Sequence, residues 1–366
     1  MSPYDPALQV LIDRVKSARD AGAQLCIRGG GTKEFYGEAP RGEVLDTRIL
    51  NGTSRYEPTE LVVTTRCGTS LTALEAMLEA QGQCLPFEPP HFGEGSTVGG
   101  MVAAGLSGPS RASAGSVRDH VLGATLLNGK GEVVTFGGQV MKNVAGYDVS
   151  RLLAGSMGTL GVILEVSLKV MPVVRAALTV RFEMNETTAL ASLNGWAGKP
   201  LPLNASAWSN GVLFVRLRGA RAAVHEARVR LGGEFVEDEF ASPFWEGLRN
   251  HSGSFFLVAL EAIASGTPLW RLSLPPTAAP LALSGESLIE WGGAQRWLRG
   301  GDARRIRAAA AKAGGHATLF RGDDALKTEV GVFQPLTAPL ARIHRHLKQA
   351  FDPQGVFNPG RMYPGL

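Results

Sequence analysis

Three glycine clusters stand out in the first half of the chain, each beside a short apolar run. They read Arg-Gly-Gly-Gly-Thr at 28–32, Ser-Thr-Val-Gly-Gly at 96–100, and Gly-Ser-Met-Gly-Thr-Leu-Gly at 155–161. Glycine adopts positive φ without strain and lets a ligand approach the main chain closely. Successive N–H groups in such loops form concavities that bind anions. Several of these loops in one domain favour a long ligand with a phosphate centre, such as a dinucleotide.

Standard nucleotide-binding signatures do not account for these clusters. The G-x-G-x-x-G pattern fails because its last position is Glu34 after Gly31 and Val98 after Gly95. The P-loop pattern fails because the Gly-Lys pair at 129–130 is followed by another glycine. The sequences H-E-x-x-H and G-x-S-x-G do not occur either. A Rossmann dehydrogenase and a P-loop NTPase are therefore disfavoured.

The composition is typical of a large globular protein with a real core. The chain has 366 residues, which predicts two or three domains, and 44% of them are hydrophobic against 19% charged. The net charge of +4 comes without a run of Lys or Arg, so nucleic acid is not an expected partner. Cys26, Cys67 and Cys84 have no C-x-x-C spacing, so neither an iron–sulfur cluster nor a zinc site is expected.

The sequence predicts a cytoplasmic protein. Three cysteines, an odd number, fit a reducing compartment better than a disulfide framework. Residues 1–6 lack the basic and apolar regions of a signal peptide, and no apolar run reaches the ~20 residues that a membrane-spanning helix needs. Association with the inner face of the cell membrane is expected only as a peripheral contact, through partner proteins.

Alternating strands and helices must position the glycine clusters. Before Pro172, apolar spacing predicts a helix at 8–21, strands at 25–27, 61–64 and 164–170, and a hairpin whose turn is Asn-Gly-Lys-Gly at 128–131. After Pro172 the glycine clusters thin out, and the pattern predicts a strand at 211–218 and helices at 221–230, 302–312 and 337–350. We therefore expect a first domain that carries the loops and a second α+β layer that acts as a cap.

Six segments of the chain follow one another in an order that is typical of one family. They are residues 28–33, 94–105, 115–123, 142–148, 155–161 and 356–361. Together they resemble the FAD-binding domain of the vanillyl-alcohol oxidase type, also called PCMH-type. The resemblance implies an α+β fold with a two-subdomain PCMH-type FAD-binding domain at 1–172 and a smaller α+β cap domain at 173–320. It also implies that a C-terminal segment, 321–366, returns to the flavin site.

The resemblance implies that FAD is bound non-covalently. Some members of the family attach FAD through a histidine in the first loop, but residues 31–35 contain neither histidine nor cysteine. The residues expected to bind FAD are Arg28, Gly29, Gly30, Gly31, Thr32, Lys33, Ser96, Thr97, Gly99, Gly100, Ala104, Gly105, Gly115, Val117, Arg118, Gly158, Gly161, Val162, Asn358 and Arg361.

Candidates for catalytic roles are few. Tyr147 either faces the isoalloxazine ring or is a packing residue, and His316 is either a core residue or a cleft residue of the cap. The resemblance places Arg361 near the reactive edge of the ring. Arg28 and Arg118 either face a phosphate or a substrate carboxylate, or form surface ion pairs.

A metal site is not expected. Relatives that oxidise 2-hydroxy acids often carry a metal-binding motif resembling H-x-G-D-G-x-x-H in the cap, and this chain has no such cluster of histidines. The sequence therefore assigns no metal ligands and no general base for the proton of a substrate hydroxyl.

Within this family, the chain resembles the smaller of the FAD-binding subunits of bacterial glycolate oxidase. The resemblance implies an FAD-dependent oxidoreductase that oxidises glycolate, or a similar small 2-hydroxy acid, to glyoxylate or the matching 2-oxo acid. It also implies two partners, a larger FAD-linked glycolate oxidase subunit and an iron–sulfur subunit. Two alternatives stay open: a complete flavoenzyme that clamps the carboxylate with Arg118 or Arg361, and an FAD-binding electron-relay or structural subunit without its own substrate site.

Overall fold

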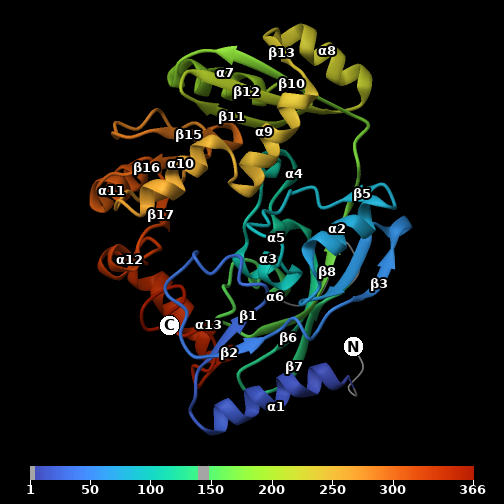
Figure 1. Cartoon of the computed structure of the whole chain (residues 1–366), viewed down its shortest axis with the longest axis vertical. Helices are drawn as coiled ribbons and strands as arrows, with labels where there is room; N and C mark the ends of the chain where they lie inside the picture. The colour runs from blue at the N-terminus through green and yellow to red at the C-terminus, as the bar shows by residue number, and fades with distance from the viewer. Residues whose placement is uncertain (1–4, 139–147) are drawn as a thin grey trace. The chain divides into compact units, whose positions relative to one another are not determined.

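The computed structural model describes residues 5–138 and 148–366, which form two compact units (Figure 1). The first unit consists of the chain as far as Leu106 together with residues 116–173 and 335–366, and the second consists of residues 107–115 and 174–334. Tyr147 lies outside the described residues. The functional domain bounds expected from the sequence, at 172 and 320, stay a proposal.

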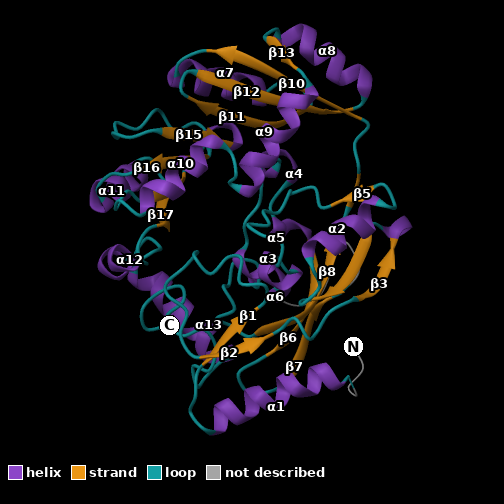
Figure 2. Ribbon diagram, in the orientation of Figure 1, coloured by secondary structure: helices purple, strands orange, loops and turns teal. Residues whose placement is uncertain are grey.

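The centre of the first unit is a five-stranded antiparallel sheet with the order β3-β4-β8-β6-β7 (Figure 2). Its strands are β3 (Thr53–Glu57), β4 (Val62–Arg66), β6 (Val121–Leu127), β7 (Val133–Gly137) and β8 (Val162–Lys169). The hairpin predicted at 128–131 is confirmed, since it joins β6 to β7. Its turn is closed by Asn128, whose side-chain oxygen accepts hydrogen bonds from the N–H groups of Lys130 and Glu132.

A separate parallel pair of strands leads into the first glycine cluster. It consists of β1 (Leu25–Arg28) and β2 (Glu43–Asp46). The end of the chain lies along β1, because the Leu25 N–H donates to Val356 O at 2.7 Å and the Asn358 N–H donates to Leu25 O at 2.9 Å. The last residues of the chain therefore pair with β1 in the first unit, while the expected return of residues 321–366 to the flavin site stays a proposal. Two shorter strands, β5 (Gln83–Cys84) and β9 (Met171–Pro172), pair antiparallel in the same unit.

Helices of the first unit pack on these strands. They are α1 (Pro6–Asp20), η1 (Pro58–Glu60), α2 (Leu71–Glu79), α3 (Val98–Ala104), α5 (Val117–His120), α6 (Val149–Leu152) and α13 (Ala338–Phe351). The helix predicted at 8–21 is confirmed as α1, which begins earlier because the Asp5 carboxylate accepts the N–H groups of Ala7 and Leu8. The core is aliphatic with two fully buried aromatic rings, Phe87 and Phe357. Phe357 belongs to the C-terminal segment, so that segment is part of the core.

The second unit is built on an eight-stranded antiparallel sheet with the order β13-β10-β12-β11-β15-β16-β14-β17. Its strands are β10 (Ala176–Glu183), β11 (Leu203–Ser209), β12 (Val212–Gly219), β13 (Glu234–Val236), β14 (Leu269–Ser273), β15 (Ser287–Glu290), β16 (Gln295–Arg299) and β17 (His316–Arg321). The strand predicted at 211–218 is confirmed as β12. The second unit is therefore an α+β layer with its own large sheet.

Helices accompany this sheet along the chain. They are α4 (Arg111–Ala114), α7 (Glu186–Ala197), α8 (Arg221–Leu231), α9 (Asp238–Asn250), α10 (Ser254–Ile263), η2 (Trp291–Gly293), α11 (Ala303–Lys312) and α12 (Asp324–Val330). The helix predicted at 302–312 is confirmed as α11, whose N-cap Asp302 accepts the N–H of Arg305 at 2.9 Å. Across residues 5–138 and 148–366, the helices are too short or too polar to cross a membrane.

Candidate functional site

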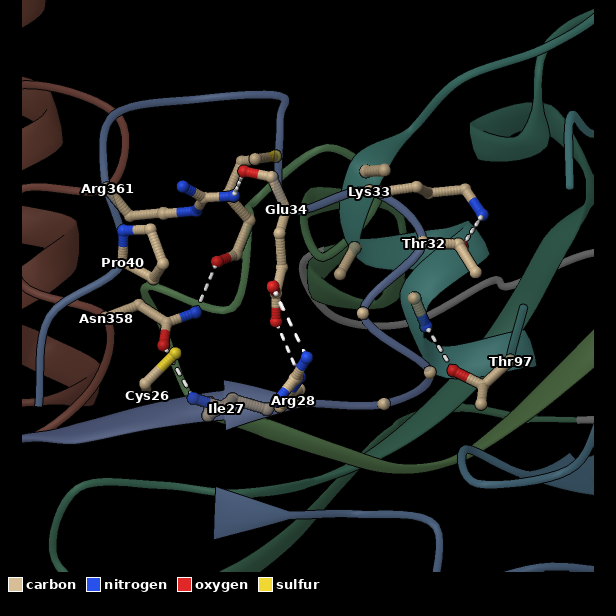
Figure 3. Close-up of a pocket in the computed structure, with 17 residues that line it drawn as sticks. Cys26, Ile27, Arg28, Thr32, Lys33, Glu34, Pro40, Thr97, Asn358 and Arg361 are labelled. Atoms are coloured by element: carbon tan, nitrogen blue, oxygen red, sulfur yellow. Dashed lines mark hydrogen bonds and ion pairs between the residues drawn. The ribbon is translucent and has the colours of Figure 1, made fainter. Parts of the chain in front are cut away.

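The first unit contains an open cleft beside β1 (Figure 3). Its void is about 620 Å³, a volume that includes the solvent at its mouth. The lining comes from β1 and the loop after it, from α3, and from two segments near residues 157 and 358–361. The lining residues are Cys26, Ile27, Arg28, Gly29, Gly30, Gly31, Thr32, Lys33, Glu34, Pro40, Thr97, Gly100, Ala103, Ala104, Met157, Asn358 and Arg361.

The first glycine loop, defined as residues 29–33, presents its backbone to this cleft. Within the described part of the chain, its five N–H groups have no hydrogen-bond acceptor. Gly31 has φ +73°, and a Cβ on Gly30 would lie 1.5 Å from the carbonyl oxygen of Gly95. Glycine is therefore required at both positions. Successive unpartnered amides of this kind form an anion-binding site.

The second glycine loop, defined as residues 96–100, uses its backbone differently. The Gly99 N–H donates to Cys67 O at 2.8 Å, and the Gly100 N–H donates to the Thr97 hydroxyl at 3.2 Å. A Cβ on Gly99 would lie 2.7 Å from the Cβ of Cys67. This loop therefore packs α3 against the end of β4, and it contributes Thr97 and Gly100 to the cleft.

The third glycine cluster is attached to the end of α3. The Gly155 N–H donates to Val102 O at 3.0 Å and the Met157 N–H donates to Ala103 O at 2.9 Å. These carbonyls belong to the last turn of the helix, where Val102 O also accepts the N–H of the C-cap residue Gly105 at 3.1 Å. The pairing places Met157 in the lining of the cleft.

Asn358 joins three segments at one wall of the cleft. Its Oδ1 accepts the Ile27 N–H at 2.7 Å, and its Nδ2 donates to Met157 O at 2.7 Å. Figure 3 shows the side chain beside Cys26 and Ile27. A Cβ on Gly158 would lie 2.6 Å from Asn358 Nδ2, so the glycine makes room for this contact. Asn358 therefore fixes β1 relative to the C-terminal segment.

Arg361 fixes the chain that follows the first glycine loop. Its guanidinium donates to the carbonyl oxygens of Glu34 at 2.8 Å and Tyr36 at 2.7 Å, and also to that of Glu38. The residue is 7% exposed, and burial lowers the pKa of its guanidinium. Arg361, which the family resemblance placed near the reactive edge of the flavin ring, thus donates its hydrogen bonds to three backbone carbonyls of residues 34–38.

Lys33 places a half-buried cation at the end of the first glycine loop. Its ammonium group donates to the Ser96 hydroxyl at 2.8 Å and to His91 O at 3.2 Å. Burial lowers the pKa of Lys33 to about 8. In the described chain, no carboxylate lies within ion-pair distance of this ammonium group. An anion in the cleft would therefore be favoured by both the amides and the charge.

Arg28 is held by a carboxylate rather than pointing openly into the cleft. Its Nε lies 2.6 Å from Glu34 Oε1, and Figure 3 shows the two side chains facing each other. The Arg28 and Glu34 side chains are 47% and 41% exposed. The surface ion pair that the sequence left open for Arg28 is present. Glu34 is also the one carboxylate among the lining residues described above.

Several expected FAD-binding residues do not line the cleft. These are Ser96, Gly99, Gly105, Gly115, Val117, Arg118, Gly158, Gly161 and Val162. Gly115 belongs to the second unit, as does the catalytic candidate His316. Arg118 is exposed on α5, whereas Val117 is fully buried. Their assignment to FAD stays a prediction.

Six residues of the lining were not among the site residues expected from the sequence. They are Cys26, Ile27, Glu34, Pro40, Ala103 and Met157. Cys26 and Ile27 were identified as strand residues, and the strand running into the loop was the available signal. Burial raises the pKa of the Cys26 thiol, which keeps it protonated. Among the described residues, no cluster of three His, Cys, Asp or Glu side chains could hold a metal ion.

Comparison with known proteins identifies one relative that matches nearly the whole chain and others that match part of it. Residues 8–137 match the family model of the FAD binding domain. The glycolate oxidase subunit GlcE of Escherichia coli (strain K12) is 48% identical over 359 residues, covering 98% of both chains. The glycolate oxidase subunit GlcD of Bacillus subtilis (strain 168) is 32% identical over 147 residues, which cover 40% of this chain and 31% of that protein.

A solved structure shares the fold. Alkyldihydroxyacetonephosphate synthase superposes with a TM-score of 0.67 at 15% identity, covering 96% of this chain and 74% of its own. At this identity the likeness shows the fold alone. Together with the family model, it confirms the predicted α+β fold of the PCMH type. The family model and the Escherichia coli relative confirm the prediction of FAD as the cofactor.

Proposed function

Because the chain belongs to the family of glycolate oxidase subunit GlcE, we propose that it is the FAD-binding subunit of a glycolate oxidase complex. In this proposal the complex oxidises glycolate, or a similar small 2-hydroxy acid, to the 2-oxo acid. The observation that carries the proposal is the 48% identity over 98% of both chains, since a match of this extent includes both units.

The residues of the cleft fit FAD. A diphosphate needs donors and positive charge, and the cleft offers the five unpartnered N–H groups of residues 29–33 beside the Lys33 ammonium group. Ala103 and Ala104 of α3 also line the cleft, and their small side chains occupy little of its space. When bound, FAD supplies the ring that accepts a hydride from the carbon bearing the hydroxyl.

The roles of individual residues follow from their contacts. The first glycine loop binds the pyrophosphate through its N–H groups, and Lys33 contributes charge. Asn358 and Arg361 hold β1 and residues 34–38 in place around this loop. They are positioning residues, since their polar atoms are bound to backbone groups of the protein. Binding is non-covalent in this proposal, because burial keeps the nearby Cys26 thiol protonated and weakly nucleophilic.

One observation favours the alternative role as an electron-relay or structural subunit. The described lining contains no histidine, and its carboxylate, Glu34, is paired with Arg28. The lining therefore offers neither a histidine nor an unpaired carboxylate as a general base for the substrate hydroxyl. In this alternative the chain binds FAD, and glycolate is oxidised on a partner.

The proposed partners are a larger FAD-linked glycolate oxidase subunit and an iron–sulfur subunit. The name of the Escherichia coli relative supports a multisubunit complex, and that of the Bacillus subtilis relative supports a partner of the GlcD type. The cysteine spacing of this chain supports placing the iron–sulfur cluster on another polypeptide. Location in the cytoplasm, with membrane contact only through partners, stays a prediction from the sequence.

Absorption spectroscopy on the purified chain tests the proposal. We expect a flavin spectrum after incubation with FAD, and release of the flavin when the protein is denatured. Glycolate is then added without oxygen, first to the chain alone and then with the larger subunit. Bleaching of the chain alone would place the complete reaction here, whereas bleaching only with the partner would establish the relay role. Failure to bind FAD would contradict both.

A further inference from the structure

An arginine stands in a fixed orientation on the large sheet of the second unit. Arg271 lies on β14 directly opposite Trp297 of β16, and Gln295 lies two residues before Trp297, on the same face of the sheet. The Arg271 Nε–H donates to Gln295 Oε1 at 2.6 Å. The guanidinium carbon lies 5.4 Å from the ring centre of Trp291 and 6.0 Å from that of Trp297. One amide and two indole rings therefore hold the guanidinium.

Gln295 and Trp297, which contact Arg271, are both hydrogen-bonded to Glu290. Gln295 Nε2 donates to Glu290 Oε2 at 3.0 Å, and Trp297 Nε1 donates to the same oxygen at 2.6 Å. Because the Gln295 nitrogen is used by Glu290, its oxygen must face Arg271. Glu290, Gln295 and Trp297 are 3%, 4% and 2% exposed, respectively. The residues next to Arg271 are thus buried, and their hydrogen bonds fix the orientation of the Gln295 amide.

The protein does not use the outer nitrogens of Arg271. Over residues 5–138 and 148–366, neither Nη1 nor Nη2 of Arg271 has a hydrogen-bond or ion-pair partner. Two other arginines of this unit behave differently, because Arg296 donates to Ala279 O and Arg307 donates to Gly331 O through their outer nitrogens. Those two side chains stabilise loops. Arg271 is partly exposed and leaves a planar pair of donors available.

The charge of Arg271 contributes to lowering the pKa values of two histidines, His316 and His251. Burial and the charge of Arg271 lower the pKa of His316, with burial as the larger effect. Burial, Arg321 and Arg271, in that order, lower the pKa of His251. Both imidazoles are therefore mainly uncharged at pH 7 and add little positive charge beside the guanidinium of Arg271.

We propose that Arg271 is the centre of a binding site for a small carboxylate anion on the second unit. The two outer nitrogens match the two oxygens of a carboxylate, and the rings of Trp291 and Trp297 fix the position of the guanidinium. The ligand class is a small monocarboxylate. Its identification with the 2-hydroxy acid of the reaction rests on the proposed function.

Tryptophan fluorescence provides a direct readout, since both indoles border the site. The purified full-length chain is titrated with sodium glycolate at constant ionic strength. Glycolamide, in which an uncharged amide replaces the carboxylate, is the matched probe, and sodium chloride measures the general effect of salt. We expect a saturable change in emission with glycolate and none with glycolamide or chloride.

Variants assign the change to Arg271. Arg271→Met should abolish the saturable change, and Arg271→Lys should weaken glycolate binding about tenfold, because lysine lacks the planar pair of donors. Arg304→Met removes an exposed arginine from α11 of the same unit and should bind glycolate like the wild type. Circular dichroism checks folding. Arg271→Lys keeps a cation at the site and stays informative if the methionine variant does not fold.

The results that would contradict a carboxylate site at Arg271 are as follows. Unchanged glycolate affinity in both Arg271 variants, or equal binding of glycolamide, would overturn the site, as would a lack of saturation in the wild type. FAD retention is measured on the same samples by visible absorption. A chain that binds FAD but not glycolate refutes the carboxylate site alone, whereas a chain that binds glycolate through Arg271 but never FAD refutes the proposed function alone.

Discussion

The two glycine loops that meet at the cleft differ in the use of their backbone N–H groups. In the first loop, the backbone N–H groups of residues 29–33 have no acceptor among the described residues. In the second loop, the Val98 N–H donates to Thr69 O at 2.9 Å and the Gly99 N–H donates to Cys67 O at 2.8 Å. Both loops are rich in glycine, but among the described residues the first leaves all five of its amides without an acceptor, whereas the second uses most of its amides within the protein. Nearby carbonyls, rather than glycine content, decide whether such a loop binds an anion.

The side chains beside the two loops differ in the same sense. Lys33 places a cation at the first loop, and burial lowers its pKa to about 8. Cys67 lies against the second loop, where burial raises the pKa of its thiol to about 12 and keeps it neutral. The positive charge and free N–H groups of the first loop would therefore be compensated by a diphosphate. The second loop needs glycine because its backbone packs closely against Cys67.

The largest expected effect is that of Gly30→Ala on FAD binding. The new Cβ would lie 1.5 Å from Gly95 O, which forces the first glycine loop away from its position. We expect a loss of about 3 kcal/mol, which corresponds to about 100-fold in FAD affinity measured by fluorescence titration. Gly195→Ala is the matched control, because a Cβ there meets nothing within 4 Å. Normal FAD affinity in Gly30→Ala would contradict the role of the first loop.

Gly99→Ala should act on stability instead. Its Cβ would lie 2.7 Å from the Cβ of Cys67, so the helix must shift to relieve the contact. We expect the free energy of unfolding in urea to fall by about 2 kcal/mol. The folded fraction should retain FAD affinity within about threefold. If FAD affinity fell as much as in Gly30→Ala while stability stayed unchanged, the contrast between the loops would be wrong.

A smaller effect is expected from Lys33 and from pH. An anion raises the pKa of a neighbouring ammonium group, so FAD binding should take up a proton and FAD affinity should fall as pH rises above about 8. The dissociation constant should rise by up to about tenfold per pH unit in that range. Lys33→Met should bind about tenfold more weakly at pH 7 and lose the pH dependence. An equal pH dependence in the variant would show that another group titrates.

The smallest effect is expected from Glu34→Gln. The Arg28–Glu34 pair is 47% and 41% exposed, and exposed ion pairs contribute about 0–1 kcal/mol. Thermal unfolding and FAD titration should both stay close to the wild type. A large loss of FAD affinity would mean that the ion pair, rather than the amides of the first loop, holds the loop in its binding conformation.

Local features of the fold could be predicted from the sequence. The turn at 128–131 closes on the Asn128 side chain, and α11 begins at the cap Asp302, so each depends on residues next to one another in the chain. The first glycine loop could be predicted for the same reason. Short-range hydrogen bonding and steric freedom set these structures whatever surrounds them.

Long-range partners could not be predicted in this way. The difference between the loops depends on Cys67 and Thr69, which follow another strand. Arg361 was identified as a residue near the flavin, but its bonds to Glu34 and Tyr36 join positions more than three hundred residues apart. The cluster around Arg271 could not be predicted from the sequence, because its members come from three strands and from the short helix η2. These members are Arg271, Glu290, Trp291, Gln295 and Trp297. Such contacts depend on tertiary packing rather than on local pattern.

The pairing of the C-terminal segment with β1 has a consequence for biosynthesis. Leu25 leaves the ribosome early, but its hydrogen-bond partners Val356 and Asn358 emerge only after the whole second unit has been translated. A nascent chain therefore completes its large sheet before the wall of the cleft exists. We therefore expect a chain that ends before residue 356 to lack this wall of the cleft and to retain FAD poorly.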